Sequence, residues 1–265
     1  MKYIRNKGFA FVEALEGDAK RTFTVSEAQQ RLGVPKKHAL AILGTLRRQK
    51  RIVTLTKGLY ALWHPSERKQ GLHPLPILDA LMRFRKTGYY VGLLSAADHY
   101  GSAHHKPQVL QVVLPRQLQF RKAKNLRISF HAHKGFPLKG IVRVKNPGGT
   151  IAFSSPELTA LDILYFESAC GGFGNVCLVI HDLIRLLDRR NLKEMIQAYP
   201  HAASIQRLGF LMEYFKADPP LIKPVEQWAG QRTLAPVALS PGYPKKGRLR
   251  KNWGVIENAS VEIEP

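Results

Sequence analysis

The stretch at residues 35–62 constrains the fold most, because a helical pattern passes directly into a hairpin pattern. Apolar residues recur at helical spacing to about residue 49, and Pro35 suits the first helical position, where its missing N–H costs nothing. Two β-rich runs follow at 51–55 and 59–62, joined by the turn 56–58. The apolar stripe of the helix consists of Ala39, Ile42, Leu43 and Leu46. The stretch therefore predicts a helix followed by a β-hairpin.

Two shorter helices are predicted upstream of this stretch. Residues 9–15 form the first, which ends at Gly17. Ser26 and Gln29 have the spacing of a capping box, so we expect the second helix to begin at Ser26. It ends at Gly33, because glycine readily adopts the left-handed conformation past a helix end. Helices, a glycine-containing turn, a basic helix and a hairpin in this order are typical of a winged helix-turn-helix.

The face of the third helix opposite its apolar stripe carries small or basic residues. Such a face suits the major groove of DNA, because small residues allow close approach and basic ones meet phosphates or guanine edges. Taken alone, the face is more commonly a solvated helix surface, but the basic hairpin that follows favours DNA contact. The predicted DNA-binding residues are Lys36, Lys37, Ala41, Thr45, Arg47, Arg48, Arg51 and Lys57.

The net charge of the chain is +22, from 41 Lys and Arg against 19 Asp and Glu, which favours a polyanionic partner. The excess is +10 in residues 1–70, +11 in residues 71–150 and only +1 in residues 151–265. Residues 99–156 contain no acidic side chain. We expect a second basic surface in this region, formed by Arg116, Arg121, Lys122, Lys124 and Arg127.

The remaining chain alternates short helices and strands. The polar residues 64–71 are expected to be a linker. Further helices are predicted at 76–86, 93–100, 156–166, 176–187, 192–199 and 205–215. Consecutive strands at 109–114, 126–130, 140–144 and 150–153 favour an antiparallel sheet. After Pro219 no regular structure is expected.

The predicted fold class is therefore α+β, with an N-terminal winged helix-turn-helix ahead of a larger mixed domain of short antiparallel strands and C-terminal helices. We expect a DNA-binding domain at residues 1–70 and a second domain at 71–235. A basic, irregular segment is expected at 236–265.

Three motifs, in their order along the chain, resemble the AbiEi family of antitoxins. They are the end of the hairpin at 57–62, the sequence Tyr-Tyr-Val-Gly-Leu-Leu-Ser-Ala-Ala-Asp-His-Tyr-Gly at 89–101, and Ser-Pro-Glu-Leu-Thr-Ala-Leu-Asp at 155–162. The resemblance extends to about Phe215, and the length of the segment after Pro219 departs from it.

The resemblance implies a transcriptional autorepressor that binds inverted repeats in its own promoter through the winged helix. It also implies that the second domain is an antitoxin. Its target would be a co-encoded nucleotidyltransferase-like toxin of a type IV system, in which direct binding of the two proteins is not required.

A metal site is poorly supported. Cys170, Cys177 and His181 do not have the short recurring spacings of four zinc ligands, and cysteines are more commonly buried and structural. The histidines at 104–105 and 131–133 have no grouped acids in sequence, so we expect them on the basic surface or at a strand end.

A catalytic site is poorly supported as well. The Glu-Arg-Lys sequence at 67–69 lies in the expected linker, and Glu157 and Asp162 point different ways on one helix, where we assign them to the helix dipole and to packing. The glycine-rich residues 171–174 lack a following Lys-Ser/Thr and suit a helix-entry loop. We expect no enzyme, no cofactor and no metal.

Two alternatives to a DNA-binding antitoxin stay open. One is an RNA-binding or ribosome-associated factor that uses residues 99–156, where Phe120 and Phe130 are the candidate base-stacking rings. A nucleic-acid-modifying enzyme ranks well behind. With no signal peptide, no membrane-spanning run and only two cysteines, a cytoplasmic protein is expected.

Overall fold

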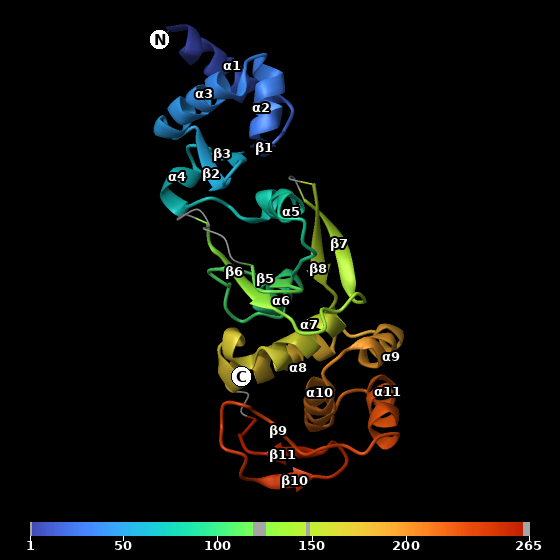
Figure 1. Cartoon of the computed structure of the whole chain (residues 1–265). Helices are drawn as coiled ribbons and strands as arrows, with labels where there is room; N and C mark the ends of the chain where they lie inside the picture. Colours follow the sequence, from blue (N-terminus) through green and yellow to red (C-terminus); the bar gives the residue numbers. More distant parts are fainter. Residues whose placement is uncertain (1, 119–125, 147–148, 262–265) are drawn as a thin grey trace. The chain divides into compact units, whose positions relative to one another are not determined.

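The computed structural model describes residues 2–118, 126–146 and 149–261 (Figure 1). Its helices and small sheets confirm the α+β class. The chain forms two compact units. The first unit contains residues 1–89, 117–130 and 143–151. The second contains residues 90–116, 131–142 and 152–265. None of the helices described is long and apolar enough to cross a membrane.

The first unit begins with the elements of a winged helix-turn-helix. In chain order these are α1 (Lys2–Gly17), β1 (Thr22–Thr24), α2 (Val25–Leu32), α3 (Lys36–Arg48), β2 (Ile52–Thr56) and β3 (Leu59–Leu62). The three strands form an antiparallel sheet in the order β1-β3-β2. Leu15, Phe23 and Leu43 are among the residues of its core. The predicted helix-and-hairpin pattern is confirmed.

Two local predictions in this region were wrong, and one was right. The first helix begins at Lys2, seven residues before the predicted start. Pro35 precedes α3 rather than occupying its first position: it has φ −60° and ψ 156°, and its carbonyl accepts from the Ala39 N–H. The end of α2 is as predicted, because Gly33 is left-handed with φ 61°.

The capping box of α2 is formed by Thr24 and Glu27, not by Ser26 and Gln29. The Thr24 hydroxyl accepts from the Glu27 N–H at 3.2 Å, and the Glu27 carboxylate accepts from the Thr24 N–H at 2.7 Å. Both pairs have the same sequence spacing. Thr24 ends β1 in the extended conformation that an N-cap requires, which decides between them.

The expected linker at 64–71 contains a short helix, α4 (Glu67–Gln70). Its Glu67 carboxylate pairs with Arg21 at 2.6 Å, so the segment is tied to the winged helix. The next helix, predicted at 76–86, is α5 (Leu75–Phe84), and it buries Leu78 and Leu81. Phe84, at the end of the helix, is 39% exposed.

A five-stranded sheet follows, with strand order β6-β5-β4-β8-β7. Its strands are β4 (Tyr90–Val91), β5 (Leu110–Leu114), β6 (Ile128–Ala132), β7 (Ile141–Asn146) and β8 (Gly149–Ser154). The prediction of an antiparallel sheet was wrong in one pairing, because β4 runs antiparallel to β5 but parallel to β8. The two-residue strand β4 is too short to produce an alternating pattern, so sequence reasoning missed it.

The helices of the second unit lie within a few residues of their predicted ranges. They are α6 (Leu93–His99), α7 (Pro156–Tyr165), α8 (Gly172–Ile184), α9 (Arg189–Ala198) and α10 (Ala202–Tyr214). A 3₁₀ turn, η1 (Glu167–Cys170), precedes α8. The Ser155 hydroxyl caps α7 by accepting from the Leu158 N–H.

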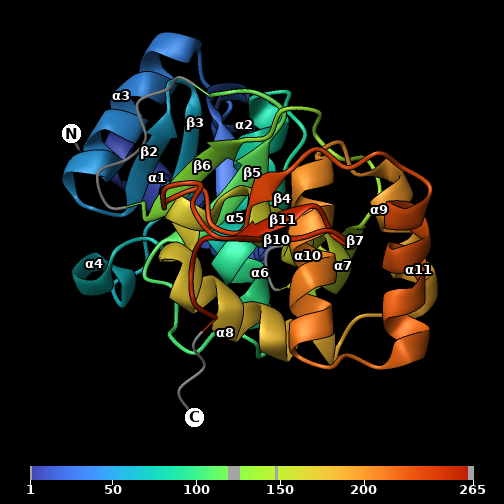
Figure 2. The same cartoon turned by 90° about the horizontal axis from the view of Figure 1, so that it is seen from below.

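The segment after residue 218 is regular, which contradicts the prediction. It forms α11 (Pro219–Gly230) and a three-stranded sheet of β9 (Val237–Ala238), β10 (Arg248–Arg250) and β11 (Val255–Glu257). Pro219 and Pro220 occupy the first turn of α11, where a missing N–H is tolerated, so they open the helix rather than prevent it. Figure 2 shows α10 and α11 side by side, and α9 packs against α11.

Candidate nucleic-acid interface

The predicted recognition face of α3 is exposed. Lys37, Ala41 and Arg48 are exposed and Thr45 is half-buried. The apolar stripe on the other side of the helix is at most 3% exposed. The burial of α3 therefore separates a packing face from a free face, as the sequence pattern predicted.

Two hydrogen bonds order the free face. The Arg48 guanidinium donates to the Thr45 hydroxyl at 3.0 Å, and that hydroxyl donates to the Ala41 carbonyl at 3.2 Å. The Thr45 hydroxyl therefore uses its proton on the backbone and one of its lone pairs on Arg48. This bond engages one nitrogen of the Arg48 guanidinium, which has further N–H donors for a base edge or a phosphate.

The flanks of α3 add one residue that sequence reasoning missed. Lys36 and Arg47 are exposed as expected. Leu40, next to Ala41 in sequence, is 42% exposed although it is apolar. An exposed apolar side chain on such a helix can contact a thymine methyl group. Its position off the apolar stripe was the available signal.

The turn of the hairpin presents Lys57 to solvent. Gly58 follows it with φ +91°, a conformation that favours glycine, so the turn depends on this residue. Arg51 differs from the other predicted residues. It is half-buried, and its guanidinium lies 5.2 Å from the centre of the Phe9 ring, so part of its role is to pack against α1.

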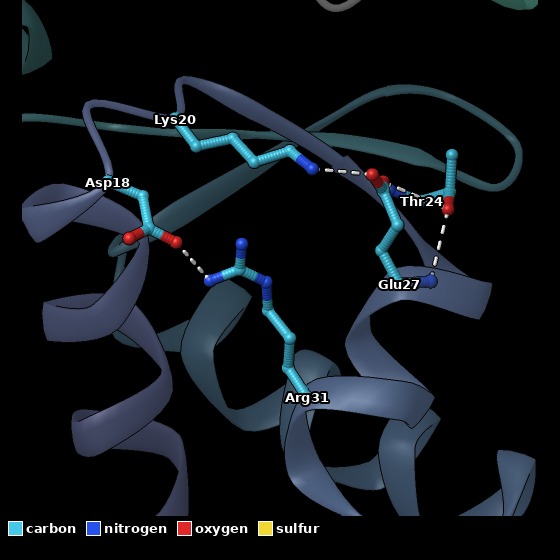
Figure 3. A network of polar contacts seen from close by, with 5 residues as sticks. All are labelled: Asp18, Lys20, Thr24, Glu27 and Arg31. Atoms are coloured by element: carbon cyan, nitrogen blue, oxygen red, sulfur yellow. Dashed lines mark hydrogen bonds and ion pairs between the residues drawn. The ribbon is translucent and has the colours of Figure 1, made fainter.

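Ion pairs divide the cations of the winged helix into two groups. Arg31 of α2 pairs with Asp18 at 2.6 Å, and Lys20 pairs with Glu27 of α2 at 2.5 Å, so both pairs join α2 to the segment that follows α1 (Figure 3). The second group pairs with no acid among the residues described: Lys36, Lys37, Arg47, Arg48 and Lys57. The unneutralised charge of this region therefore includes the cations of α3 and of the hairpin turn.

The predicted second basic surface is only partly described. Arg116 and Arg127 are exposed. Arg121, Lys122 and Lys124 lie outside the described residues, as does Phe120. Phe130, the other candidate for base stacking, is half-buried in β6. The prediction of this surface stays open.

The centre of the second unit is a buried polar cluster around Asp162 on α7. The Asp162 carboxylate accepts from the Tyr90 hydroxyl at 2.6 Å and from the Tyr199 hydroxyl at 2.8 Å. His133 Nε2 lies 3.2 Å from the same carboxylate. All four side chains are buried. Burial, with the carboxylate of Asp162 beside them, holds the pKa of both tyrosines well above the usual value, so they remain hydrogen-bond donors.

This cluster corrects the sequence interpretation of residues 131–133. His133 directly follows β6, as expected of a strand-end residue, but it lies inside the unit beside an acid rather than on the surface. His104 also has an acidic neighbour, with its Nε2 at 3.1 Å from the Asp182 carboxylate. Both acids are distant in sequence, so no local pattern could reveal them.

The residues of two sequence motifs meet at this centre. Tyr100, from the motif at 89–101, donates to the Ser154 carbonyl at 2.7 Å. Ser154 and Thr159 share a hydrogen bond of 2.6 Å. Together with the pair between Tyr90 and Asp162, these contacts fix β4 and α6 to β8 and α7. The motifs therefore specify packing.

The cysteines are packing residues. Cys170 and Cys177 are buried and unpaired. Burial, together with nearby carboxylates, raises the pKa of each thiol to about 12, so both stay protonated at neutral pH. Glu157, assigned to the helix dipole, lies in the first turn of α7. It is 2% exposed and accepts from the Ser155 hydroxyl and from the Asp188 N–H.

Comparison with known proteins gives one family and one fold. Residues 90–214 match the sequence model described as the AbiEi antitoxin C-terminal domain. The crystal structure of the RV2827C protein from Mycobacterium tuberculosis is similar with a TM-score of 0.69, over 95% of this chain and 91% of that one. At 17% sequence identity this likeness concerns the fold alone. None of the curated proteins matches the chain.

Proposed function

We propose that the chain is the antitoxin of a toxin–antitoxin system and a DNA-binding autorepressor, because residues 90–214 match the AbiEi antitoxin C-terminal domain. In this proposal the winged helix binds inverted repeats in the promoter of its own operon. The opposed toxin is a co-encoded nucleotidyltransferase-like protein, which the antitoxin counters in the cytoplasm without an obligatory complex.

The observation that carries the DNA-binding proposal is the face of α3. Lys37 and Arg48 are exposed there, on the side opposite the core stripe, and neither pairs with an acid among the described residues. Ala41 between them allows close approach of the helix to a groove. Lys57 on the hairpin turn supplies a cation for the flanking phosphates.

A gel-shift titration of the full chain on its own promoter fragment tests this proposal. Lys37→Glu and Arg48→Glu should each lower operator affinity by roughly 10-fold to 100-fold, because a base contact typically contributes about 1–3 kcal/mol. Lys193→Glu is the matched control, since Lys193 is an exposed cation on α9 and its replacement changes the net charge equally.

Operator affinity unchanged in both α3 variants would remove α3 as the reading helix. An equal loss in the Lys193 control would mean that net charge alone drives binding. A two-fold symmetric footprint on the promoter is expected if two copies bind inverted repeats.

We assign the two roles to the two predicted domains. Residues 1–70 should bind operator DNA but fail to protect cells from the toxin, whereas residues 72–265 should protect. If protection depends on the second basic surface, charge reversal at Arg121, Lys122 and Lys124 should abolish it at normal expression. Full protection by that triple variant would assign those residues to auxiliary DNA contact instead.

A further inference from the structure

The C-terminal sheet presents a strongly basic segment outside the residues that match the antitoxin family. Every residue from 241 to 252 is exposed, and the segment contains no acid. It includes the edge strand β10, which pairs on one side only, with β11. Its cations are Lys245, Lys246, Arg248, Arg250 and Lys251.

The loop that leads into β10 is held by a single side chain, Asn258. Its amide nitrogen donates to the carbonyls of Ser240, Tyr243 and Pro244 at 2.8, 3.1 and 3.2 Å. Its amide oxygen accepts from the Ser240 N–H at 3.0 Å. The backbone of the loop is therefore turned toward Asn258, and its side chains are presented outward in a defined arrangement.

The sheet itself is anchored to α10. Gln206 donates to the carbonyls of Trp253 at 3.0 Å and Gly254 at 3.3 Å. Arg207 donates to the Ala238 carbonyl at 2.9 Å, and the Trp253 ring is 3% exposed. The basic segment is thus a built part of the second unit, fixed at both ends of its strand.

The segment keeps most of its charge available. Arg250 pairs with Glu257 at 2.8 Å. The other four cations form no ion pair within the part of the chain that the structure describes. Among these charges Tyr243 is 56% exposed and Leu249 is 41% exposed. An exposed aromatic ring beside cations without ion pairs is the combination that binds unpaired bases.

Protection of a sheet edge explains only part of this composition. Charged residues on an edge strand discourage pairing with other chains, which accounts for Arg248 and Arg250 on β10 itself. It does not account for Lys245, Lys246 and Tyr243, because they precede the strand on the loop that Asn258 holds.

We propose that residues 243–251 bind single-stranded nucleic acid, with Tyr243 stacking on a base and the lysines and Arg248 contacting phosphates. Duplex DNA offers its bases only at their edges, so an exposed ring favours a single strand over a duplex. This surface is independent of α3 and of the operator binding proposed above.

Fluorescence anisotropy with labelled oligonucleotides of about 12 nucleotides, within the usual footprint of such sites, tests the proposal. The full chain carries Lys37→Glu and Arg48→Glu, so that α3 does not dominate the signal. Single-stranded RNA, single-stranded DNA and the corresponding duplex are compared. Binding of either single strand more tightly than the duplex supports the proposal, and the first two arms distinguish RNA from DNA.

Variants of the exposed residues locate the site. Tyr243→Ala should weaken single-strand binding about fivefold or more, while Tyr243→Phe should retain it, because stacking needs the ring and not the hydroxyl. Lys245→Glu with Lys246→Glu should weaken binding and flatten its salt dependence. Lys193→Glu with Lys223→Glu is the matched control, since both are exposed on α9 and α11.

Tighter binding of the duplex, or no binding of either single strand, would overturn the proposal. The same holds if Tyr243→Ala binds as well as the unmodified surface, or if the control pair weakens binding as much as the loop pair. Unfolding transitions of the variants should match the parent, because the replaced side chains are exposed.

Discussion

Two regions of this protein use charged residues in opposite ways. On α3, Lys37 and Arg48 are exposed and have no acidic partner among the residues described. Around Asp162, a carboxylate is fully buried and receives two tyrosine hydroxyls. The first arrangement leaves charge free for a ligand, and the second uses charge to fix the fold.

This difference separates residues that can be changed freely from those that cannot. A buried carboxylate is tolerable only while its hydrogen-bond partners are in place, so each member of the cluster depends on the others. An exposed cation is solvated in the free protein, so its loss costs little until a polyanion binds. The cluster should therefore control stability and the α3 face should control affinity.

The largest expected effect is that of Asp162→Ala. It leaves the hydroxyls of Tyr90 and Tyr199 buried without their acceptor, and we expect a loss of about 3–5 kcal/mol in the free energy of unfolding. Denaturant unfolding followed by circular dichroism measures it. Lys37→Glu with Arg48→Glu should change the same quantity by less than about 0.5 kcal/mol. Equal losses in the two variants would contradict the comparison.

The sequence predicted the α3 region well because its signals are local. Helical spacing, a left-handed glycine at Gly33 and the turn at Gly58 each act within a few residues. The capping box was misplaced because two pairs share one spacing, and the conformation at the end of β1 decides between them.

The cluster could not be predicted because its members meet through the fold. His133 and Asp162 are 29 positions apart in sequence, and Tyr90 lies 72 positions from Asp162. The motif containing Asp162 was correctly assigned to packing, but its partners follow from the parallel pairing of β4 with β8, which has no sequence signature. The C-terminal sheet was missed for a related reason, since its strands are two or three residues long.

The next effect concerns DNA affinity rather than stability: Lys57→Ala should weaken binding to all DNA sequences by a similar factor. A phosphate contact positions the protein without reading bases, so the slope of log K against log salt should become shallower by about 0.9. Salt titrations of the gel shift on the operator and on a scrambled fragment measure this. A loss of affinity confined to one base position, or an unchanged salt slope, would show that Lys57 does not act through a phosphate contact.

A smaller effect is expected at the cap of α2, where Thr24→Ala removes the hydroxyl that accepts from the Glu27 N–H. Removal of such a cap typically costs about 1 kcal/mol of stability. Thr24→Ser, which keeps the hydroxyl, is the matched control. Because α2 carries none of the predicted DNA-binding residues, operator affinity should be retained wherever the variant is folded. A strong loss of affinity at full folding would show that α2 contributes to the interface directly.

The smallest effect concerns Glu27. Its ion pair with Lys20 is partly exposed, so it is intermediate between the buried Asp162 cluster and the exposed cations of α3. Burial raises the pKa of its carboxyl, but hydrogen bonds from Lys20 and from Thr24 outweigh that and lower the pKa below the usual value of 4.5. In the unfolded chain Glu27 thus takes up its proton at a higher pH than in the folded protein. Its contribution to stability is present above pH 4.5 and is lost as the pH falls through the folded pKa. Solvent screening keeps this contribution below about 1 kcal/mol.

Glu27→Gln preserves an acceptor for the Thr24 N–H but removes the titration of the carboxyl. The stability of this variant should therefore fall less than that of the wild type between about pH 5 and pH 3. Urea unfolding at these two values measures the difference, and Glu13→Gln, which replaces an exposed carboxylate on α1, is the control. Equal losses for wild type and Glu27→Gln would mean that the capping box, and not the ionised pair with Lys20, accounts for the whole contribution of Glu27.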